Sequence, residues 1–400
     1  MPDAARPTIL CVASYFKGER FLERTKQEGA RVLLLTAENC LGESWPRPSI
    51  DELFALPNFN DRRHIINAVA FLARTRPFRR IVALDDFDVE LVAHLRDHMR
   101  LTGFSESRAR LFRDKLAMRT EAARLGIRVP EFTPIIWHDD VRHFLANVPA
   151  PWLLKPRSQA SAMGIQKLHH AEDVWRAIEK LGDEQSFHLL ERMVPGDLYH
   201  VDSLVADNKV VFAEVNQYHR PLLDVYQGGG VYATRTLPRN RPEVAALRAA
   251  NEKVLTGFEL GRGASHTEFM KAHADGELYF IETSARVGGA NTAEMVEAAT
   301  GINLWSEWAK LEVDADQPYK LPPVKNRFAG VVVSLAKQEW PDTSGFADPE
   351  IVYRMKKKQH IGLVVAADDP ARIDALLKSY MERIARDFTA TLPPAMKASG

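Results

Sequence analysis

The sequence contains little cysteine and no long apolar run. Only two cysteines, Cys11 and Cys40, occur in 400 residues, which is too few for a disulfide framework or a cysteine-based zinc site. We interpret both as structural thiols in a reducing compartment. No apolar run reaches about 18 residues, and residues 1–7 lack the apolar segment of a signal peptide. These absences predict a cytoplasmic protein that does not span a membrane.

The chain also lacks net charge. Lys and Arg total 53, Asp and Glu total 53, and the formal net charge is +0. Such a chain has no overall field to attract nucleic acid or an anionic membrane, so neither is predicted as a partner. Any anionic ligand must be held by a local cluster of donors. Hydrophobic residues make up 46%, enough to build the cores of more than one domain.

Strand and helix patterns alternate through the first hundred residues, which predicts a parallel sheet of Rossmann type. No G-x-G-x-x-G follows the first strand, where the chain reads Ser14-Tyr15-Phe16-Lys17-Gly18, so this sheet is not predicted to bind a dinucleotide. Asp85 and Asp86 end its last strand and could bind an amino group or cap the next helix. The predicted strands are 9–13, 31–36 and 81–84, and the predicted helices are 19–28 and 62–75.

Downstream patterns are more varied. A basic helix is predicted over 105–125, a strand over 152–156, and a loop of small residues over 157–164. A hairpin is expected across Asp207-Asn208 and a second across Asp275-Gly276, while the glycine run 228–230 indicates a mobile loop. Strands at 328–335 and 361–366 and a helix at 370–387 complete a mixed α/β tail.

Two glutamates stand out on the strands that flank Asp275-Gly276. If the hairpin closes there, Glu268 and Glu282 lie side by side, where they repel unless a hard divalent cation sits between them. The alternative is that both simply face solvent.

Two further features suggest a phosphate site. Lys155 lies in an apolar strand, where burial requires an anionic partner, and the small residues after it let backbone N–H groups approach a phosphate. Arg286, followed by Gly288-Gly289, could hold a carboxylate or a developing oxyanion. A strand-end lysine beside a plain surface loop, and an ordinary surface turn, are the alternatives.

The order of these features resembles the ATP-grasp superfamily over residues 105 to 310. A lysine in a helix (RDKLAMR) precedes a lysine in a strand (LLKPR), then E-x-x-x-P-G, then E…E-x-x-x-R-x-G-G. The block HTEFMKAHADGELYFIETSARVGG, with YHVD at 199–202, is most similar to carboxylate–amine ligases that act on amino acids.

The resemblance implies ATP and Mg²⁺ (or Mn²⁺) as cofactors. It implies that Lys115 and Lys155 hold the α- and β-phosphates and that the loop 158–164 covers them, with Ser158, Ser161 and Gly164 as contacts. It assigns adenine to Glu191, Met193 and Val194. It implies that Glu268 and Glu282 bind magnesium. It also implies that Arg286 stabilises the acyl phosphate and the tetrahedral intermediate, and that Lys155 takes part in catalysis.

Two positions depart from the family pattern. Ser284 occupies the position at which E-x-N-x-R has asparagine. The serine hydroxyl offers a single oxygen that is a weaker ligand, which puts a second metal in doubt. Leu198 occupies the expected position of the ribose acid, so Asp197, His200 or Asp202 could substitute, and His200 is favoured. His266, Arg235, Gly288 and Gly289 are candidate substrate contacts, although His266 could equally be structural and Arg235 a solvated loop residue, as could His219-Arg220.

The predicted architecture is α/β, with an α+β central region. It comprises a Rossmann-like domain (1–104), two ATP-grasp subdomains (105–190 and 191–315) and a small C-terminal α/β subdomain (316–400). The predicted function is a ligase that joins a small-molecule carboxylate and an amine through an acyl phosphate, releasing ADP and phosphate. Another ATP-grasp ligase, of biotin carboxylase or purine-pathway type, and a non-catalytic regulatory protein are the alternatives. A homodimer is the commonest oligomer to expect.

Overall fold

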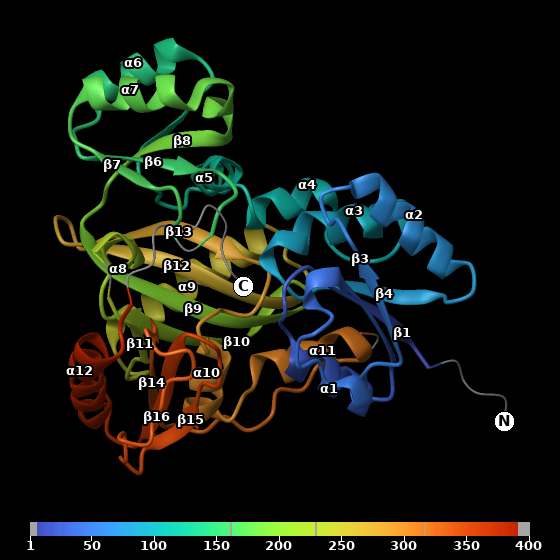
Figure 1. Cartoon of the computed structure of the whole chain (residues 1–400). Coiled ribbons are helices and arrows are strands. Elements are labelled where there is room, and N and C mark those ends of the chain that lie inside the picture. The colour runs from blue at the N-terminus through green and yellow to red at the C-terminus, as the bar shows by residue number, and fades with distance from the viewer. Residues whose placement is uncertain (1–5, 161, 229, 316, 391–400) are drawn as a thin grey trace.

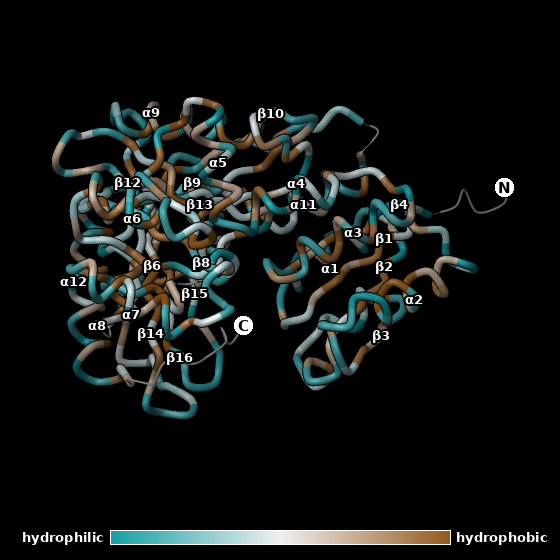
Figure 2. Tube along the Cα trace, turned by 90° about the horizontal axis from the view of Figure 1, so that it is seen from above, coloured by the Kyte–Doolittle hydropathy of each residue, from teal (hydrophilic) through white to brown (hydrophobic). Residues whose placement is uncertain are grey.

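The computed structural model describes residues 6–160, 162–228, 230–315 and 317–390, and its strands form three sheets (Figure 1). A small sheet with two helices forms a cap above the largest sheet, and the N-terminal lobe lies to one side (Figure 1). Seen from above, brown hydrophobic strands run through that lobe while its outer loops are teal (Figure 2). No described helix is both long and apolar enough to cross a bilayer.

The N-terminal sheet is parallel throughout, with strand order β3-β2-β1-β4. Its strands alternate with helices as predicted, except that β3 was not anticipated. All five residues of β3 are only half-buried, as suits an edge strand, so it lacks the apolar run that identifies its neighbours. The elements are β1 (Thr8–Ala13), α1 (Glu19–Gln27), β2 (Arg31–Ala37), β3 (Glu52–Leu56), α2 (Arg62–Ala73), β4 (Phe78–Ala83) and α3 (Val89–Met99).

The cap is a four-stranded antiparallel sheet covered by two helices (Figure 1). The helices bury Val141, Phe144, Val174 and Ile178 against the sheet in one apolar cluster. The strand order is β5-β8-β6-β7. The elements are β5 (Phe132–Pro134), α6 (His138–Asn147), β6 (Trp152–Pro156), β7 (Gln166–Leu168), α7 (Ala171–Leu181) and β8 (His188–Arg192).

The largest sheet has eight antiparallel strands, ordered β13-β12-β9-β10-β11-β14-β16-β15. Both predicted hairpins are present, and Asp207 and Asn208 take positive φ of 49° and 59°, as a tight β9–β10 turn needs. Strands after residue 316 extend this sheet, while the predicted domain boundaries stay predictions. The strands are β9 (Gly196–Ala206), β10 (Lys209–Tyr218), β11 (Tyr232–Thr236), β12 (Gly263–Ala272), β13 (Leu278–Ser284), β14 (Phe328–Leu335), β15 (Ile351–Arg354) and β16 (His360–Ala367).

Four of the described helices pack on this sheet, and a further helix ends within the predicted glycine loop. Residues 222–228 form α8 (Leu222–Gly228), so the expected loop begins as a helix, while Gly229 lies outside the described residues. The other helices are α9 (Pro242–Gly257), α10 (Thr292–Thr300), α11 (Leu304–Val313) and α12 (Pro370–Asp387).

The single helix predicted over 105–125 is broken. It consists of α4 (Glu106–Ala109), a 3₁₀ turn over 110–112, and α5 (Lys115–Arg124). The break follows from Asp114, which has extended backbone and whose carboxylate accepts the Leu116 N–H at 2.9 Å as an N-cap. Because α5 starts afresh at this point, Lys115 occupies its first position.

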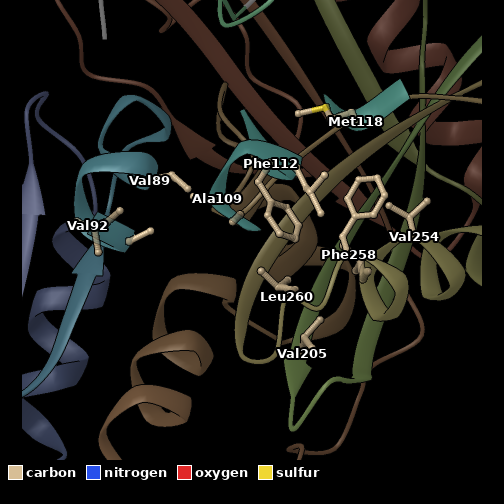
Figure 3. Packing of buried hydrophobic residues seen from close by; sticks show 14 of the residues in the cluster. Val89, Val92, Ala109, Phe112, Met118, Val205, Val254, Phe258 and Leu260 are labelled. Carbon is tan, nitrogen blue, oxygen red and sulfur yellow. The ribbon is translucent and has the colours of Figure 1, made fainter. Parts of the chain in front are cut away.

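One apolar cluster joins the N-terminal lobe to the largest sheet (Figure 3). Val89 and Val92 come from α3, Phe112 from the turn before α5, and Phe258 from the end of α9 (Figure 3). The rings of Phe112 and Phe258 meet edge to face with centroids 6.0 Å apart. This continuous core holds the end of β4 close to the sheet that carries Glu268 and Glu282.

Gly196 at the start of β9 provides a test of the close strand packing. A Cβ at this position would lie 2.3 Å from the Lys271 carbonyl oxygen of β12. We expect Gly196→Ala to lower the free energy of unfolding by about 1–3 kcal/mol, the usual cost of overpacking. Gly42→Ala is the control, because a Cβ at Gly42 meets nothing within 4 Å. Equal melting temperatures for both variants would contradict the packing.

Candidate active site

The two glutamates singled out in the sequence are direct cross-strand partners. Glu268 on β12 pairs with Glu282 on β13, beside a β-bulge between Glu268 and Phe269. Glu268 is buried and Glu282 is half-buried. Their predicted proximity is confirmed, and two carboxylates this close need a positive partner.

Two adjoining cavities meet at this pair. The larger has a volume of about 370 Å³ and the smaller about 270 Å³. Both are lined by Lys115, Gln159, Leu222, Glu268 and Glu282. The glutamates therefore form part of the wall between two compartments, each of which can hold a different ligand.

The larger cavity combines apolar walls with a few polar groups. Leu153 of the cap and Met270 and Ile281 of the largest sheet supply apolar surface, which suits a flat heterocycle. Met193 and Val194, predicted as adenine contacts, line this cavity where the chain passes from the cap to β9.

Three buried charged side chains form a cluster at the edge of this cavity. Lys155 contacts Glu191, whose other carboxylate oxygen lies 2.8 Å from the Arg119 guanidinium. Burial lowers the pKa of Lys155, and Glu191 opposes that shift. Burial likewise works against ionisation of Glu191, but Arg119 and Lys155 hold its pKa below the ordinary value. The cluster carries one surplus positive charge, which suits a phosphate.

Lys115 connects the Glu268–Glu282 pair to the loop after β6. Its ammonium lies 2.9 Å from Glu282 and donates to the Gln159 carbonyl at 2.6 Å. The Lys115 backbone N–H donates to the Arg157 carbonyl at 2.8 Å, and Arg113 donates to the Ser158 carbonyl at 2.6 Å. The start of the loop is therefore anchored on Lys115 of α5 and on Arg113 just before it.

The loop lines the cavities with residues other than those predicted. Gln159, Ala162 and Met163 line the larger cavity, whereas the exposed Ser158 and Gly164 line neither. The contact of Ser158 and Gly164 with a phosphate therefore stays a prediction. Ser161 lies outside the described residues.

The smaller cavity lies between the N-terminal lobe and the largest sheet. Asp86 forms a buried 2.5 Å ion pair with Arg113, and Arg286 Nε lies 3.9 Å from Asp86 Oδ1. Among the described residues, both of these last two atoms are buried without a hydrogen-bond partner. Tyr218 and Tyr232 form an aromatic wall, with centroids 5.7 Å apart.

The sequence did not identify Arg113, Tyr218 or Tyr232 as site residues. Arg113 lies two residues before Lys115 in RDK, which could have drawn attention to it. Each tyrosine ends or begins a strand, and no spacing in the sequence distinguishes it from a core tyrosine.

His266 lies where the sequence placed it, beside Glu268 and in the wall of the smaller cavity. Its Nδ1–H donates to Asp202 at 2.8 Å, and its Nε2 lies 3.5 Å from Glu268 Oε1. Burial alone would lower the pKa of His266, but Asp202 and Glu268 raise it to about 9. The imidazolium therefore offsets part of the negative charge of the pair. Ser284 also lines this cavity.

The packing of Asp202 against His266 also explains why residue 288 is glycine. A Cβ at Gly288 would lie 2.9 Å from both Asp202 Oδ1 and His266 Nδ1, so only glycine fits without displacing them. Gly289, the other predicted contact, is exposed and lines the smaller cavity.

Two predicted contacts lie elsewhere. Arg235 pairs with Asp374 of α12 and donates to Gln217 at 2.9 Å, on the face of β11 opposite Tyr232 and Thr234. Arg235 therefore lines neither cavity, which argues against its predicted contact with a substrate.

His200 is fully buried and bonded at both ring nitrogens, to Asp202 and to Thr234, each at 2.7 Å. It lines neither cavity, which argues against its predicted contact with a ribose. Asp197, one of the alternatives, is exposed and lines the larger cavity.

Comparison with known proteins gives this geometry a context. The chain is 23% identical over 319 residues to the L-arginine-specific L-amino acid ligase of Bacillus subtilis, which covers 76% of each chain. L-amino acid ligase from Bacillus licheniformis superposes with a TM-score of 0.75 at 17% identity, covering 97% of this chain and 99% of that one. N5-carboxyaminoimidazole synthetase from Staphylococcus aureus, complexed with ADP, superposes with a TM-score of 0.73 at 14% identity, covering 94% and 97%.

The chain is similar in sequence and in fold to ATP-grasp carboxylate–amine ligases. No family model matches the sequence, so the assignment depends on these relatives and on the fold. The relatives are carboxylate–amine ligases, and the α/β architecture predicted from the sequence is confirmed.

The donor set fits a divalent cation. Glu268 and Glu282 supply two carboxylates on adjacent strands, and Ser284 adds a hydroxyl in the same wall. Oxygen ligands in small number, completed by phosphate oxygens and water, are what Mg²⁺ prefers. In the structure, Lys115 is the positive partner of Glu282 and His266 is that of Glu268.

Lys155→Met tests the phosphate role of the buried cluster. We expect ATP affinity to fall by about 1.5–3 kcal/mol, the value of a charge-assisted hydrogen bond, or roughly 10- to 100-fold. Isothermal titration calorimetry measures the change. Glu191 keeps Arg119 as partner in the variant, so the fold should survive. Lys167→Met, an exposed lysine on β7 of the same cap, is the control. Unchanged affinity in Lys155→Met would contradict the assignment.

Proposed function

We propose that the chain is an ADP-forming ligase that joins the carboxyl group of an amino acid, or of a closely related acid, to an amine. One observation carries the proposal: Glu268 and Glu282 line both cavities. A nucleotide in the larger cavity would then present its terminal phosphate at the carboxylate pair, next to an acid in the smaller cavity.

Each compartment suits its proposed ligand. In the larger cavity, Met193, Val194 and the apolar wall receive adenine, Asp197 is available to the ribose, and Lys115 and Lys155 receive phosphate oxygens. Mg²⁺ bound by Glu268 and Glu282 would neutralise phosphate charge during transfer. In the smaller cavity, Asp86 Oδ1 offers a negative acceptor for an ammonium group and Arg286 a donor for a carboxylate.

The proposed reaction has two steps. The carboxylate oxygen of the acid attacks the γ-phosphorus, the bond to the bridging oxygen breaks, and ADP leaves. The amine then attacks the acyl carbon, loses a proton, and expels phosphate. Arg286 lies at the carboxylate end of the smaller cavity, where its guanidinium stabilises the oxyanion of the second step. Gln159 of the loop after β6 and Leu222 of α8 line both cavities, where they would shield the acyl phosphate from water.

Nucleotide and phosphate release, measured with MgATP and pairs of amino acids, tests this function. We expect ADP and phosphate only with a particular acid and amine, together with a product whose mass is their sum less water. Bicarbonate with an amine is the comparison arm, and turnover in that arm alone would place the chain with the carboxylating ligases. Release of AMP would overturn the acyl-phosphate mechanism.

Glu282→Gln separates nucleotide binding from metal binding. Because Glu282 pairs with Lys115 at 2.9 Å, we expect the variant to free Lys115. It should bind ATP at least as tightly as the wild type in metal-free buffer, measured by calorimetry. Its Mg²⁺-dependent turnover should be lost. Wild-type turnover in Glu282→Gln would remove the metal assignment, and weaker metal-free binding would show that Lys115 does not meet a phosphate.

Two further properties belong to this proposal. The described cysteines are free and buried, as suits a reducing cytoplasm, which we propose as the compartment. Small-molecule acids and amines are the proposed partners, and the homodimer remains a prediction.

A further inference from the structure

A chain of buried polar side chains runs behind the carboxylate pair. His266 Nδ1–H donates to Asp202 Oδ1 at 2.8 Å, and His200 Nδ1–H donates to Asp202 Oδ2 at 2.7 Å. Asp202 and His200 are fully buried. The register explains the contact, because His266 of β12 pairs directly with Asp202 of β9.

The far end of this chain is fixed by β10 and β11. The Asn216 amide donates to Asp202 Oδ2 at 2.8 Å, and the other nitrogen of His200 meets the Thr234 hydroxyl at 2.7 Å. Asp202 thus accepts three hydrogen bonds from three side chains. A carboxylate held this firmly gives the imidazole of His266 one ring orientation.

At the end formed by His266, this hydrogen-bond chain contacts the predicted metal ligand Glu268. With Nδ1 bound to Asp202, Nε2 of His266 lies 3.2 Å from the Tyr218 hydroxyl and 3.5 Å from Glu268 Oε1. The Tyr218 hydroxyl donates to the same oxygen at 2.7 Å. Both groups therefore contact Oε1 of Glu268 rather than Oε2.

The cluster is better explained as a hydrogen-bond chain than as a metal centre of its own. Ligand atoms of His200, Asp202 and His266 lie within 4.8 Å of one another. However, each carboxylate oxygen of Asp202 already accepts an imidazole N–H. A cation there would displace both bonds and leave His200 without its partner.

We propose that Asp202 is a positioning residue that acts through His266 and Tyr218 to hold Glu268 in place for the cation. In this proposal, Glu268 Oε1 is held by contacts within the protein, and Oε2 is the oxygen available to the metal. The inference rests on the proposed function, since it concerns the same metal and nucleotide site. It explains why a charged network lies inside the sheet, where burial of ionic groups is costly unless each is paired.

Mn²⁺ binding in the presence of ADP tests the proposal without turnover. Electron paramagnetic resonance measures free Mn²⁺ for the wild type, Asp202→Asn and Tyr218→Phe. We expect each variant to bind Mn²⁺ about tenfold more weakly, at the lower end of the effect of removing a group that orients a metal ligand. ADP affinity without metal should stay unchanged. Asn keeps the size of Asp202, and Phe keeps the Tyr218 ring.

Thr267→Val is the matched control. Thr267 is fully buried between His266 and Glu268 on β12 but faces the opposite side of the sheet, where its hydroxyl lies 2.8 Å from that of Thr283. The variant should lose stability, seen as a lower melting temperature, while binding Mn²⁺ like the wild type. A loss of Mn²⁺ affinity in Thr267→Val equal to that in Asp202→Asn would mean that general loosening of the sheet explains the effect.

The outcomes distinguish the two levels of inference. A wild type that binds ADP but no Mn²⁺ overturns the proposed metal site itself. A wild type that binds Mn²⁺, with Asp202→Asn and Tyr218→Phe binding it equally well, overturns only the positioning role. If Asp202→Asn does not fold, Tyr218→Phe decides, since it removes a single hydroxyl that donates to Glu268.

Discussion

Antiparallel pairing of β12 with β9 on one side and β13 on the other is the constraint on which the site depends. That register sets Glu268 opposite Glu282 and His266 opposite Asp202. Because side chains alternate along a strand, His266 and Glu268 emerge on the same face while Thr267 points away. A shift of one residue in either pairing would turn the carboxylates into the core on the other face.

Each buried carboxylate at the site has a positively charged neighbour. Lys115 neutralises Glu282, His266 faces Glu268, and Lys155 shares Glu191 with Arg119. On the proposed function, a metal would take the carboxylates as partners and a polyphosphate would take the lysines. Metal and nucleotide binding would then be coupled by electrostatics, since either ligand alone would leave some buried charge unmatched.

The cavity proposed for the acid depends on a different part of the chain. Asp86 lies in the 3₁₀ turn after β4, in the N-terminal lobe, and reaches Arg286 only because the core around Phe112 and Phe258 holds the lobe against the largest sheet. The larger cavity, proposed for the nucleotide, is lined instead by the cap and by β9, β12 and β13. Such a division lets the acid site vary without disturbing the nucleotide site.

The sequence by itself determined most of the elements and the carboxylate pair. Apolar runs and tight turns are local signals, so the parallel N-terminal strands, the two hairpins, and the positions of Glu268, Glu282, Lys155 and Arg286 could be predicted. It failed where the answer depends on neighbours distant in sequence. Whether His200 faces a ligand or a carboxylate, and whether Arg235 reaches the cavity or α12, are decided by packing between strands and helices. Only the tertiary structure could bring Asp86, Arg113 and Tyr218 to one cavity, because no spacing along the chain encodes a contact between residues that different elements carry.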